Sequence, residues 1–479
     1  MVNPRFPSLY QINTRVWLNG GTLDDVPEAE LDRIAAQGFD WVWLLGVWQT
    51  GEIGRRAALA EPAMMAEYRR ALPDFQERDV CGSCFAVSAY TVERAFGGDP
   101  ALARMRERLH RRGLRIMVDF VPNHTALDHP WVREHPEFYV HGTEEDLVRN
   151  PRNYYRAGPA VLAHGRDPYF LGWQDTLQLN YAEPGLQEAM TSQLLKIAEQ
   201  ADGVRSDMAM LILPEVFEKT WGMRPQPFWP AAIARVREQC PEFVLLAEVY
   251  WDQEWELQRQ GFDYTYDKRL YDRLREGHAR PVRDHFRADG AFQRQSARFL
   301  ENHDEPRAAA TFPAAMHHAA AVLAFLCPGL RFFHQGQFEG RRIRIPVQLC
   351  RAPEEPVDQE LAAFYERLRA CLRDPIFRDG DWELLEALPA WSGNGSWDSI
   401  IAFAWSGAGG RRALVAVNYA DSQSQCYVRP PFDEIRGSQV RFEDRLGSAV
   451  YEREGDQVLA RGLYLDLGPW DCHVFEMTV

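Results

Sequence analysis

The chain has 479 residues, of which 46% are hydrophobic and 26% are charged, a composition typical of globular proteins and long enough for more than one domain. Its 54 Lys and Arg residues against 69 Asp and Glu residues give a net charge of -15, which argues against a nucleic-acid surface because phosphate binding needs clustered positive charge. No apolar run reaches the roughly 20 residues of a membrane helix, and the amino terminus lacks the pattern of a secretion signal. We therefore expect a cytoplasmic protein that binds a neutral or polar ligand.

Strand-like and helix-like segments alternate along most of the chain. Strands are expected at residues 9–18, 39–48, 115–121, 203–208, 243–250, 262–266, 297–300 and 330–334. Amphipathic helices are expected at residues 27–36, 100–112, 184–200, 230–239, 312–325 and 357–372. This alternation predicts an α/β fold, a (β/α)8 TIM barrel. An open doubly wound sheet is the alternative, but no Gly-x-Gly-x-x-Gly follows a strand.

Two insertions and a change of pattern suggest the domain organisation. Residues 52–81 follow the second strand. Residues 124–181 follow the third and are rich in aromatics, His, Pro and Asn, without clean periodicity. From about residue 383, short strands alternate with turns rich in Gly, Asn and Asp, as in an antiparallel β domain. We predict a barrel of residues 1–123 and 182–382, a small inserted domain of residues 124–181 after strand 3, and a C-terminal β-sandwich of residues 383–479.

The eight cysteines do not form the pattern of a disulfide framework and are expected to be reduced thiols. Cys81 and Cys84 have the C-x-x-C spacing of redox and zinc sites. No second pair of this kind accompanies them, so a loop with two small residues between the cysteines is the preferred interpretation.

Polar residues gather where predicted strands end, which is where barrel enzymes place their sites. The third strand ends in Asp119, Asn123 and His124, the fourth in Arg205 and Asp207, the fifth in Glu248, and the seventh in Asn302, His303 and Asp304. Each acid alone also fits a structural role, such as a buried ion pair for Asp119 or a helix N-cap for Asp207. Acids at the ends of three separate strands favour a site.

Glycosidic bond cleavage uses two or three carboxylates without an evident metal. Arg205 and Asp207, two positions apart in a strand, project to the same face, and the cation favours the ionised form of the carboxyl. Glu248 follows Leu-Leu-Ala, and an apolar setting would raise its pKa toward that of a general acid.

Four short segments resemble the signature regions of the α-amylase superfamily, in order and at the matching strands. They are Asp119-Phe-Val-Pro-Asn-His124, Gly203-Val-Arg-Ser-Asp207, Ala247-Glu248 and Glu301-Asn-His-Asp304. The resemblance implies that Asp207 is the nucleophile, Glu248 the general acid and base, and Asp304 the carboxylate that stabilises the transition state. Two carboxyls about 5 to 5.5 Å apart would make the reaction retaining.

The resemblance also implies a substrate-binding set: His124, Arg205, His303, Asn302, Phe85, Asp119 and Trp173. Trp173 lies in a looser match to a fifth signature region, where it either stacks on a sugar or packs in the core. Three features depart from the family pattern. Met208-Ala-Met replaces a frequent Lys-His pair, Cys84-Phe85-Ala86 replaces Gly-Tyr-Asp, and only Asn123 is available for the calcium ion found in many members.

These observations predict a retaining α-glycosidase that cleaves α-glucosidic linkages in oligosaccharides or polysaccharides. No cofactor is expected to be required, no metal ligand is assigned unless Asn123 binds calcium, and neither nucleic acid nor membrane is an expected partner. A transglycosidase remains an alternative, either a glucanotransferase, a sucrose-type phosphorylase or a trehalose-forming isomerase. A non-catalytic sugar-binding protein is a further alternative, although such proteins tend to lose the acids present here. The oligomeric state is left open.

Overall fold

The computed structural model describes residues 4–479, and eight parallel strands form a closed barrel. Around the barrel the strands follow the order β1-β14-β13-β12-β11-β10-β5-β2. Their bounds are Ser8–Asn13 (β1), Trp41–Leu45 (β2), Arg115–Phe120 (β5), Gly203–Ser206 (β10), Val244–Ala247 (β11), Tyr264–Tyr266 (β12), Ser296–Arg298 (β13) and Leu330–His334 (β14). The predicted fold class is confirmed.

The chain divides into two compact units. One unit, called here the N-terminal unit, comprises Tyr10–Tyr266 and Ile343–Glu354. The other, the C-terminal unit, comprises the residues up to Leu9 together with Asp267–Arg342 and Glu355–Val479. The domain boundaries predicted from the sequence stay a prediction.

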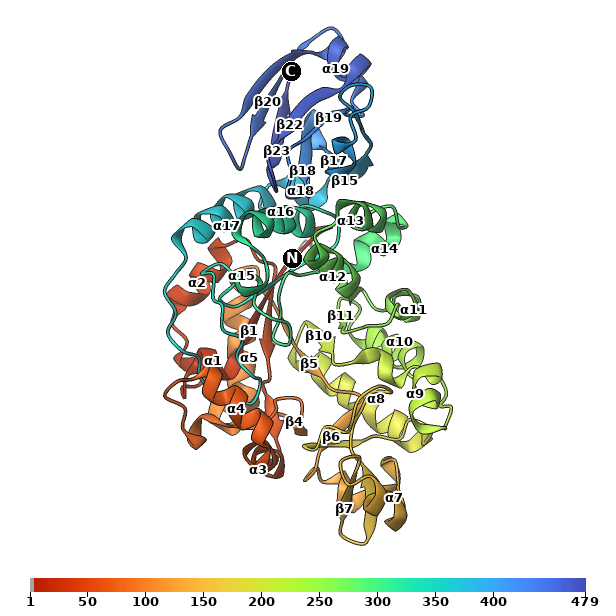
Figure 1. Cartoon of the computed structure of the whole chain (residues 1–479). Helices are drawn as coiled ribbons and strands as arrows, with labels where there is room; N and C mark the ends of the chain where they lie inside the picture. The colour runs from red at the N-terminus through yellow and green to blue at the C-terminus, as the bar shows by residue number, and fades with distance from the viewer. Residues whose placement is uncertain (1–3) are drawn as a thin grey trace. The chain divides into compact units, whose positions relative to one another are not determined.

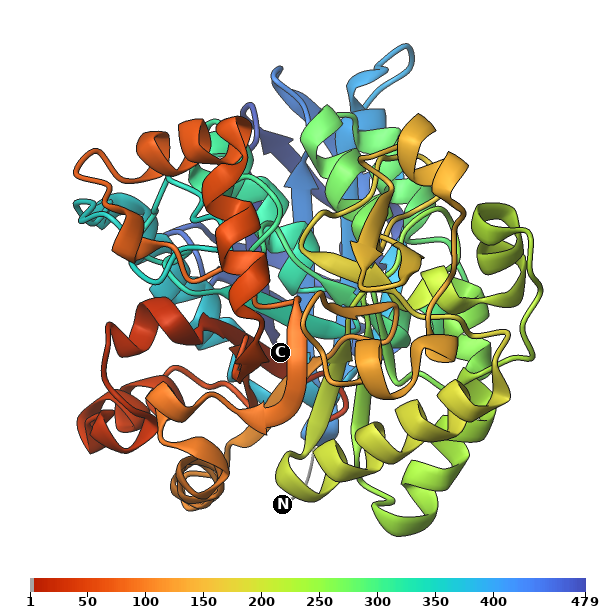
Figure 2. The ribbon, with the colours of Figure 1, turned by 90° about the horizontal axis from the view of Figure 1, so that it is seen from below.

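In the N-terminal unit, β2, β5, β10 and β11 lie side by side (Figures 1 and 2). The helices of this unit are Thr14–Leu18 (α1), Glu28–Ala36 (α2), Glu52–Ala60 (α3), Pro62–Ala71 (α4), Gly98–His110 (α5), Pro184–Gln200 (α8), Pro214–Trp221 (α9), Trp229–Gln239 (α10) and Glu254–Gln260 (α11). A short antiparallel pair, β3 (Trp48–Thr50) and β4 (Val87–Val92), connects to the second barrel strand.

Two segments of this unit differ from the expectation. The first predicted strand was extended to Leu18, but β1 ends at Asn13, whose side chain accepts a hydrogen bond from Val16 N–H and so caps α1. Residues 52–81, an insertion for which no helix is expected from the sequence, contain α3 and α4, and Pro62 occupies the first turn of α4.

The insertion after β5 contains its own short elements, drawn in orange to yellow in Figure 2. They are β6 (His124–Ala126), α6 (Trp131–Glu134), α7 (Glu144–Arg149), β7 (Tyr154–Ala157), β8 (Ala160–Ala163) and β9 (Thr176–Gln178). The pairs β6–β9 and β7–β8 are antiparallel. Because β6 follows β5 directly, the insertion starts at the carboxyl end of a barrel strand.

The C-terminal unit begins with helices and ends in two antiparallel sheets. The helices are Lys268–Glu276 (α12), Ala279–His285 (α13), Gly290–Gln295 (α14), Ala308–Thr311 (α15), Ala314–Phe325 (α16), Gln359–Leu372 (α17) and Pro375–Asp379 (α18). The side chains of α16 are apolar on almost all sides of the helix, and nine of its residues are buried, as expected of a core helix.

The last hundred residues form a sheet of six strands in the order β15-β17-β18-β23-β20-β21 and a sheet of three in the order β16-β19-β22. Their bounds are Asp381–Leu385 (β15), Ala387–Pro389 (β16), Ile400–Gly407 (β17), Arg411–Asn418 (β18), Ser424–Val428 (β19), Gln439–Asp444 (β20), Val450–Glu454 (β21), Leu463–Leu467 (β22) and Cys472–Thr478 (β23), with one helix, Gly455–Arg461 (α19). Inward-facing residues of both sheets share one apolar core. The predicted C-terminal antiparallel β domain is confirmed.

Within residues 4–479, no helix combines the length and the apolar character needed to span a bilayer.

Candidate active site

The end of β10 carries a buried group of charged side chains. Arg205 is fully buried, and its Nη1 atom lies 2.7 Å from Asp207 Oδ1. The backbone N–H of Asp207 donates to the Phe120 carbonyl at 2.8 Å, which continues the pairing of β10 with β5 by one residue. The predicted Arg205–Asp207 pair is therefore formed, and the backbone of the neighbouring strand fixes its position.

Glu248 follows β11 in the same way that Asp207 follows β10. Its N–H donates to the Ser206 carbonyl at 3.0 Å, so the parallel register places Glu248 beside Asp207. Arg205 Nη2 lies 2.7 Å from Glu248 Oε2. One guanidinium thus pairs with both carboxylates.

Two further donors approach the Glu248 carboxylate. The Met208 N–H donates to Oε2 at 2.7 Å, and the Tyr250 hydroxyl donates to Oε1 at 2.9 Å. Met208 has a left-handed backbone, with φ 42° and ψ 46°, which turns this N–H toward Glu248. The apolar setting expected around Glu248 is therefore not what the structure shows, because a cation and two polar donors meet its oxygens.

Aromatic rings enclose the Arg205 guanidinium. The rings of Trp43, Phe85 and Tyr266 have their centroids 5.3, 5.1 and 5.8 Å from its central carbon, and its Nε donates to the Tyr266 hydroxyl at 3.3 Å. Ring faces attract a cation without competing for its N–H groups. Phe85, predicted to stack on a sugar, packs on the arginine and is half-buried.

Asp119 is a buried carboxylate held by β2 and the residues that follow it. Trp43 Nε1 donates to Oδ1 at 3.1 Å, and the Gly46 N–H donates to Oδ2 at 2.7 Å. Arg205 Nη1 is 4.0 Å from Oδ1. Asp119 is therefore placed to anchor the arginine. A direct contact of Asp119 with substrate stays a prediction.

His124 and Trp173 come together at the base of the insertion. Their ring centroids lie 5.2 Å apart, and Trp173 is half-buried. His124 is 4% exposed, and burial lowers its pKa to about 3, opposed by a hydrogen bond with the Phe85 backbone. The imidazole is therefore neutral at neutral pH and serves as a hydrogen-bonding group.

The Asn123 side chain is already paired with Gln178. Its Nδ2 donates to Gln178 Oε1 at 3.2 Å, and Gln178 Nε2 donates to Asn123 Oδ1 at 3.0 Å. Calcium needs six to eight oxygen ligands, and among residues 4–479 no group of three or more His, Cys, Asp or Glu side chains is placed to hold a metal ion. The residues present do not fit a calcium ion at Asn123.

In the C-terminal unit, the segment after β13 carries the remaining predicted residues. Asn302 and His303 are buried, and Asn302 Oδ1 accepts hydrogen bonds from the N–H groups of Asp304 and Glu305 at 2.9 and 2.8 Å. His303 Nε2 lies 3.0 Å from Asp304 Oδ2. The Asp304 side chain is 46% exposed, whereas the Asp207 and Glu248 side chains are 7% and 3% exposed.

Glu301 was not predicted as a site residue. Its carboxyl is buried, lies 3.0 Å from Arg307 Nη2 and accepts a hydrogen bond from the Ala308 N–H at 2.6 Å. Burial raises the pKa of Glu301 to about 7, and Arg307 opposes this rise. It precedes the Asn302–Asp304 turn and ties that turn to the start of α15.

Sequence reasoning also missed Tyr250 and the Met208 N–H. Tyr250 stands two positions after Glu248, the spacing that drew attention to Arg205 and Asp207, so the same rule could have found it. The Met208 contact depends on a left-handed backbone that no residue type in this segment indicates.

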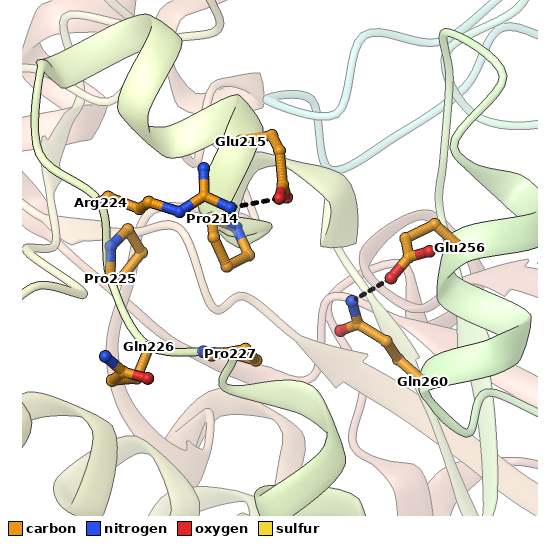
Figure 3. A pocket seen from close by; sticks show the side chains of 8 residues that line it. All are labelled: Pro214, Glu215, Arg224, Pro225, Gln226, Pro227, Glu256 and Gln260. Carbon is orange, nitrogen blue, oxygen red and sulfur yellow. Dashed lines mark hydrogen bonds and ion pairs between the residues drawn. The ribbon is translucent and has the colours of Figure 1, made fainter.

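A separate surface pocket lies between the start of α9, the loop of residues 224–227 that precedes α10, and α11 (Figure 3). Three prolines, at positions 214, 225 and 227, line one side. Its polar residues pair with one another: Arg224 with Glu215 at 2.5 Å, and Gln260 with Glu256 at 2.8 Å. None of the predicted catalytic residues lines this pocket.

A comparison with protein families agrees with this arrangement. A model of the alpha-amylase catalytic domain matches residues 85–344, a range that includes Asp207, Glu248 and Asp304. The chain belongs to the α-amylase family of glycoside hydrolases. Its membership confirms the resemblance carried by the four signature segments.

Relatives of this chain include both an amylase and a glycosyltransferase. Alpha-amylase MalA of Haloarcula japonica is 24% identical over 408 residues, which cover 83% of this chain and 53% of that protein. An alpha-1,4-glucan:maltose-1-phosphate maltosyltransferase of Salinibacter ruber is 26% identical over 259 residues, which cover 51% of this chain and 33% of that protein. The chain spans about half the length of the first curated relatives that it matches.

Solved structures of an α-amylase and of a trehalose-6-phosphate hydrolase are similar to this chain in fold. The maltogenic α-amylase AmyB of Thermotoga neapolitana superposes with a TM-score of 0.72 at 19% identity, covering 100% of both chains. The trehalose-6-phosphate hydrolase of Bacillus licheniformis superposes with a TM-score of 0.67 at 14% identity, also over 100% of both chains.

Proposed function

We propose that this protein is a retaining α-glycosidase that cleaves α-glucosidic linkages in α-glucans or oligosaccharides by double displacement. The observation that carries the proposal is the pairing of Asp207 and Glu248 with the same guanidinium, each at 2.7 Å. Asp207 is the proposed nucleophile, Glu248 the proposed acid and base, and Asp304 the proposed third carboxylate. Asp304 is included because it follows β13, and in a parallel barrel the carboxyl ends of the strands share one rim.

The shared arginine suits the charge movement of this reaction. In the first step Asp207 attacks the anomeric carbon, the glycosidic bond breaks, and Glu248 gives its proton to the leaving oxygen. Asp207 becomes a neutral ester while Glu248 becomes a carboxylate. The negative charge thus passes from one group to the other, and both positions lie against Arg205. In the second step Glu248 takes a proton from water, which attacks the anomeric carbon and frees Asp207.

The contacts of Glu248 indicate which of its oxygens carries the proton. Oε2 faces Arg205 and the Met208 N–H, two donors that favour a bare oxygen. At Oε1 the partner is the Tyr250 hydroxyl, which can rotate to accept a hydrogen bond instead of donating one and so suits a protonated oxygen. We therefore assign the transferred proton to Oε1.

Azide rescue tests the two roles separately, because azide can replace either carboxylate. Asp207→Ala and Glu248→Ala are each expected to lower turnover by about 10²-fold or more. Azide should then give the β-glycosyl azide with Asp207→Ala, after a single inversion, and the α-glycosyl azide with Glu248→Ala, after two inversions. Glu256→Gln, which removes a carboxylate of the pocket in Figure 3, is the control and should keep full turnover.

Product stereochemistry decides whether the proposal stands. The wild-type protein should release the α anomer first, as followed by NMR during early hydrolysis of a maltooligosaccharide. Release of the β anomer first, or azide products of the opposite configuration, would refute double displacement by these two residues.

A transglycosidase is the second candidate, supported by the relationship to the Salinibacter ruber maltosyltransferase and by an aromatic pair after β11. Trp251 contacts Tyr169 of the insertion with ring centroids 5.0 Å apart, and Tyr169 is 58% exposed. Such rings can hold an acceptor sugar in place of water. Oligosaccharides longer than the substrate would favour transfer, and a sugar phosphate formed only with added inorganic phosphate would favour a phosphorylase. The cytoplasmic location expected from the sequence stays a prediction.

A further inference from the structure

A pocket of the C-terminal unit lies between α15, the start of α16 and the start of α17, which are labelled in Figure 1. All of the residues that line it belong to that unit, and none of them is a predicted catalytic or substrate-binding residue. Its volume of about 350 Å³ lies at the lower end of the range of roughly 300–1,000 Å³ that is usual for small-molecule sites. The pocket is therefore large enough for a small ligand.

His317 lines this pocket although only 2% of it is exposed. Its Nε2 lies 2.8 Å from the Tyr365 hydroxyl, which accepts a hydrogen bond from Gln337 Nε2 at 2.9 Å. The Gln337 amide is oriented by its Oε1, which accepts from the N–H of His334, the last residue of β14, at 3.2 Å. The buried Tyr365 hydroxyl has no other partner among residues 4–479, so its hydrogen goes to Nε2 of His317.

The proton of the His317 ring is therefore on Nδ1. Burial lowers the pKa of His317 to about 3, so the imidazole is neutral at neutral pH and carries a single ring proton. Within the part of the chain that the structure describes, no acceptor pairs with Nδ1. Because buried donors are normally paired, this N–H is a donor for a molecule held in the pocket.

The start of α16 adds backbone donors on the same side. Pro313 precedes the helix and gives no side-chain cap, and the first helical hydrogen bond joins the His317 N–H to the Pro313 carbonyl at 2.8 Å. The N–H groups of Ala314, Ala315 and Met316 therefore have no acceptor within the helix. Pro313 and Ala314 both line the pocket, so this helix start forms part of its wall.

The charged side chains that line the pocket narrow the class of ligand. Arg342 is one of them, and its Nη1 donates to the Ala309 carbonyl. Asp358 and Glu360 are the others, and Asp358 Oδ1 also accepts from the Leu361 N–H at 3.1 Å. Two carboxylates against one guanidinium disfavour an anion, whereas the guanidinium and the N–H groups of α16 disfavour a cation. A neutral ligand whose groups both donate and accept hydrogen bonds fits this lining.

We propose that this pocket binds a neutral mono- or disaccharide, with the His317 Nδ1–H as its central donor. Sugar hydroxyls accept from Nδ1–H and from the N–H groups at the start of α16, and they donate to the carboxylates of Asp358 and Glu360. The apolar face of the sugar ring packs against Phe312 and Leu361, which also line the pocket. The choice of a glucose unit as ligand rests on the proposed function, which would release such sugars, but the site is separate from the proposed active site.

Nuclear magnetic resonance of the full-length protein, with isotope-labelled histidine nitrogens, tests the proposal. In the free protein the His317 signals, identified by their absence from His317→Phe, should show a protonated Nδ1 and an unprotonated Nε2. Glucose, which has no glycosidic bond to cleave, should shift the Nδ1 signal in a saturable way, and maltose should do the same. The readout does not depend on turnover, so loss of this site and loss of the proposed glycosidase activity are seen separately.

Two variants of exposed alanines at the start of α16 locate the binding. Ala314→Trp places a large ring in the pocket wall and should raise the dissociation constant for glucose by about tenfold or more. Ala315→Trp is the matched control, because Ala315 does not line the pocket, and it should bind glucose as the wild type does.

Four results would each overturn the proposal: a proton on Nε2 of His317, no shift with glucose or maltose at any soluble concentration, wild-type binding by Ala314→Trp, or a shift with inorganic phosphate but not with sugars. If His317→Phe does not fold, the signal that glucose shifts in the wild type and in Ala315→Trp, but not in Ala314→Trp, still decides the matter.

Discussion

At the scale of single residues, the site depends on polar contacts that connect its charged groups. Arg205 contacts both proposed catalytic carboxylates, with Oε2 as its partner on Glu248, and the Tyr250 hydroxyl donates to Oε1 of Glu248. The roles of these residues are therefore coupled, and changes to Asp207, Glu248 and Arg205 should be far from additive. Substitution of Tyr250 is a milder change, because its hydroxyl contacts one oxygen of the Glu248 carboxylate.

Tyr250→Phe is expected to lower kcat by about tenfold, since a hydrogen bond to a charged group contributes roughly 1.5–3 kcal/mol. KM for an oligosaccharide should change little. The loss of a donor disfavours the ionised form of Glu248, so the basic limb of the kcat–pH profile should move to higher pH. Tyr181→Phe is the control, because that hydroxyl donates to the Pro122 carbonyl at 2.9 Å. An unchanged pH profile for Tyr250→Phe would contradict the expected effect of this hydroxyl on the ionisation of Glu248.

At the scale of elements, Asp202 joins a helix to two barrel strands just before β10 begins. Its Oδ1 lies 2.7 Å from Arg106 Nη2 of α5, and its Oδ2 lies 2.7 Å from His110 Nε2 and 2.8 Å from the N–H of Ile116 in β5. Only 12% of its side chain is exposed. One carboxylate therefore sets the position of α5 against the strands that carry Asp119 and Asp207.

Asp202→Ala should lower the free energy of unfolding by roughly 2–4 kcal/mol, because it leaves a partly buried arginine and a buried N–H without their acceptor. Urea unfolding measures this loss. Asp32→Ala is the matched control. Asp32 pairs with Arg112 at 2.7 Å, but its side chain is 64% exposed, so a loss of about 1 kcal/mol or less is expected. Equal losses for both variants would contradict the proposed role of Asp202.

The barrel could be predicted from the sequence because each strand is one continuous, short apolar run between turns. Such a run can be recognised without knowing which segments meet in space. The local register also placed Arg205, Asp207 and Glu248 at strand ends. Contacts between distant segments could not be predicted this way. The Asn123–Gln178 pair and the aromatic rings around Arg205 depend on which segments meet in space, and neither composition nor periodicity contains that information.

At the scale of the whole molecule, several histidines are buried in the neutral form. Burial lowers the pKa of His124 and His317 to about 3 and that of His129 to about 4. Below pH 6.5 these histidines bind protons in the unfolded chain but not in the folded one. The free energy of unfolding therefore falls as the pH falls toward 3. Glu301 and Asp175 act in the opposite direction, because burial raises their pKa to about 7 and about 6. We expect the histidines, which are more numerous, to make the protein sensitive to acid.

His317→Asn should make the dependence of unfolding free energy on pH shallower by about 1.4 kcal/mol per pH unit between pH 4 and 6, the contribution of one proton. Urea unfolding at several pH values measures the slope. Tyr365→Phe is the control, because it removes the hydroxyl that lies 2.8 Å from His317 Nε2 and leaves the histidine in place. The prediction fails if His317→Asn keeps the wild-type slope.

The segment Ile343–Glu354, which belongs to the N-terminal unit, has a consequence for attempts to shorten this protein. A fragment cut at the limits of the family match, residues 85–344, would keep Asp207, Glu248 and Asp304. It would lose Leu349 and Arg351 together with the loop that they hold, and that loop leads directly into Phe85, whose ring packs on Arg205. It would also lose β1 and β2, two strands of the closed barrel, so we expect an active fragment to extend beyond the range of the family match on both sides.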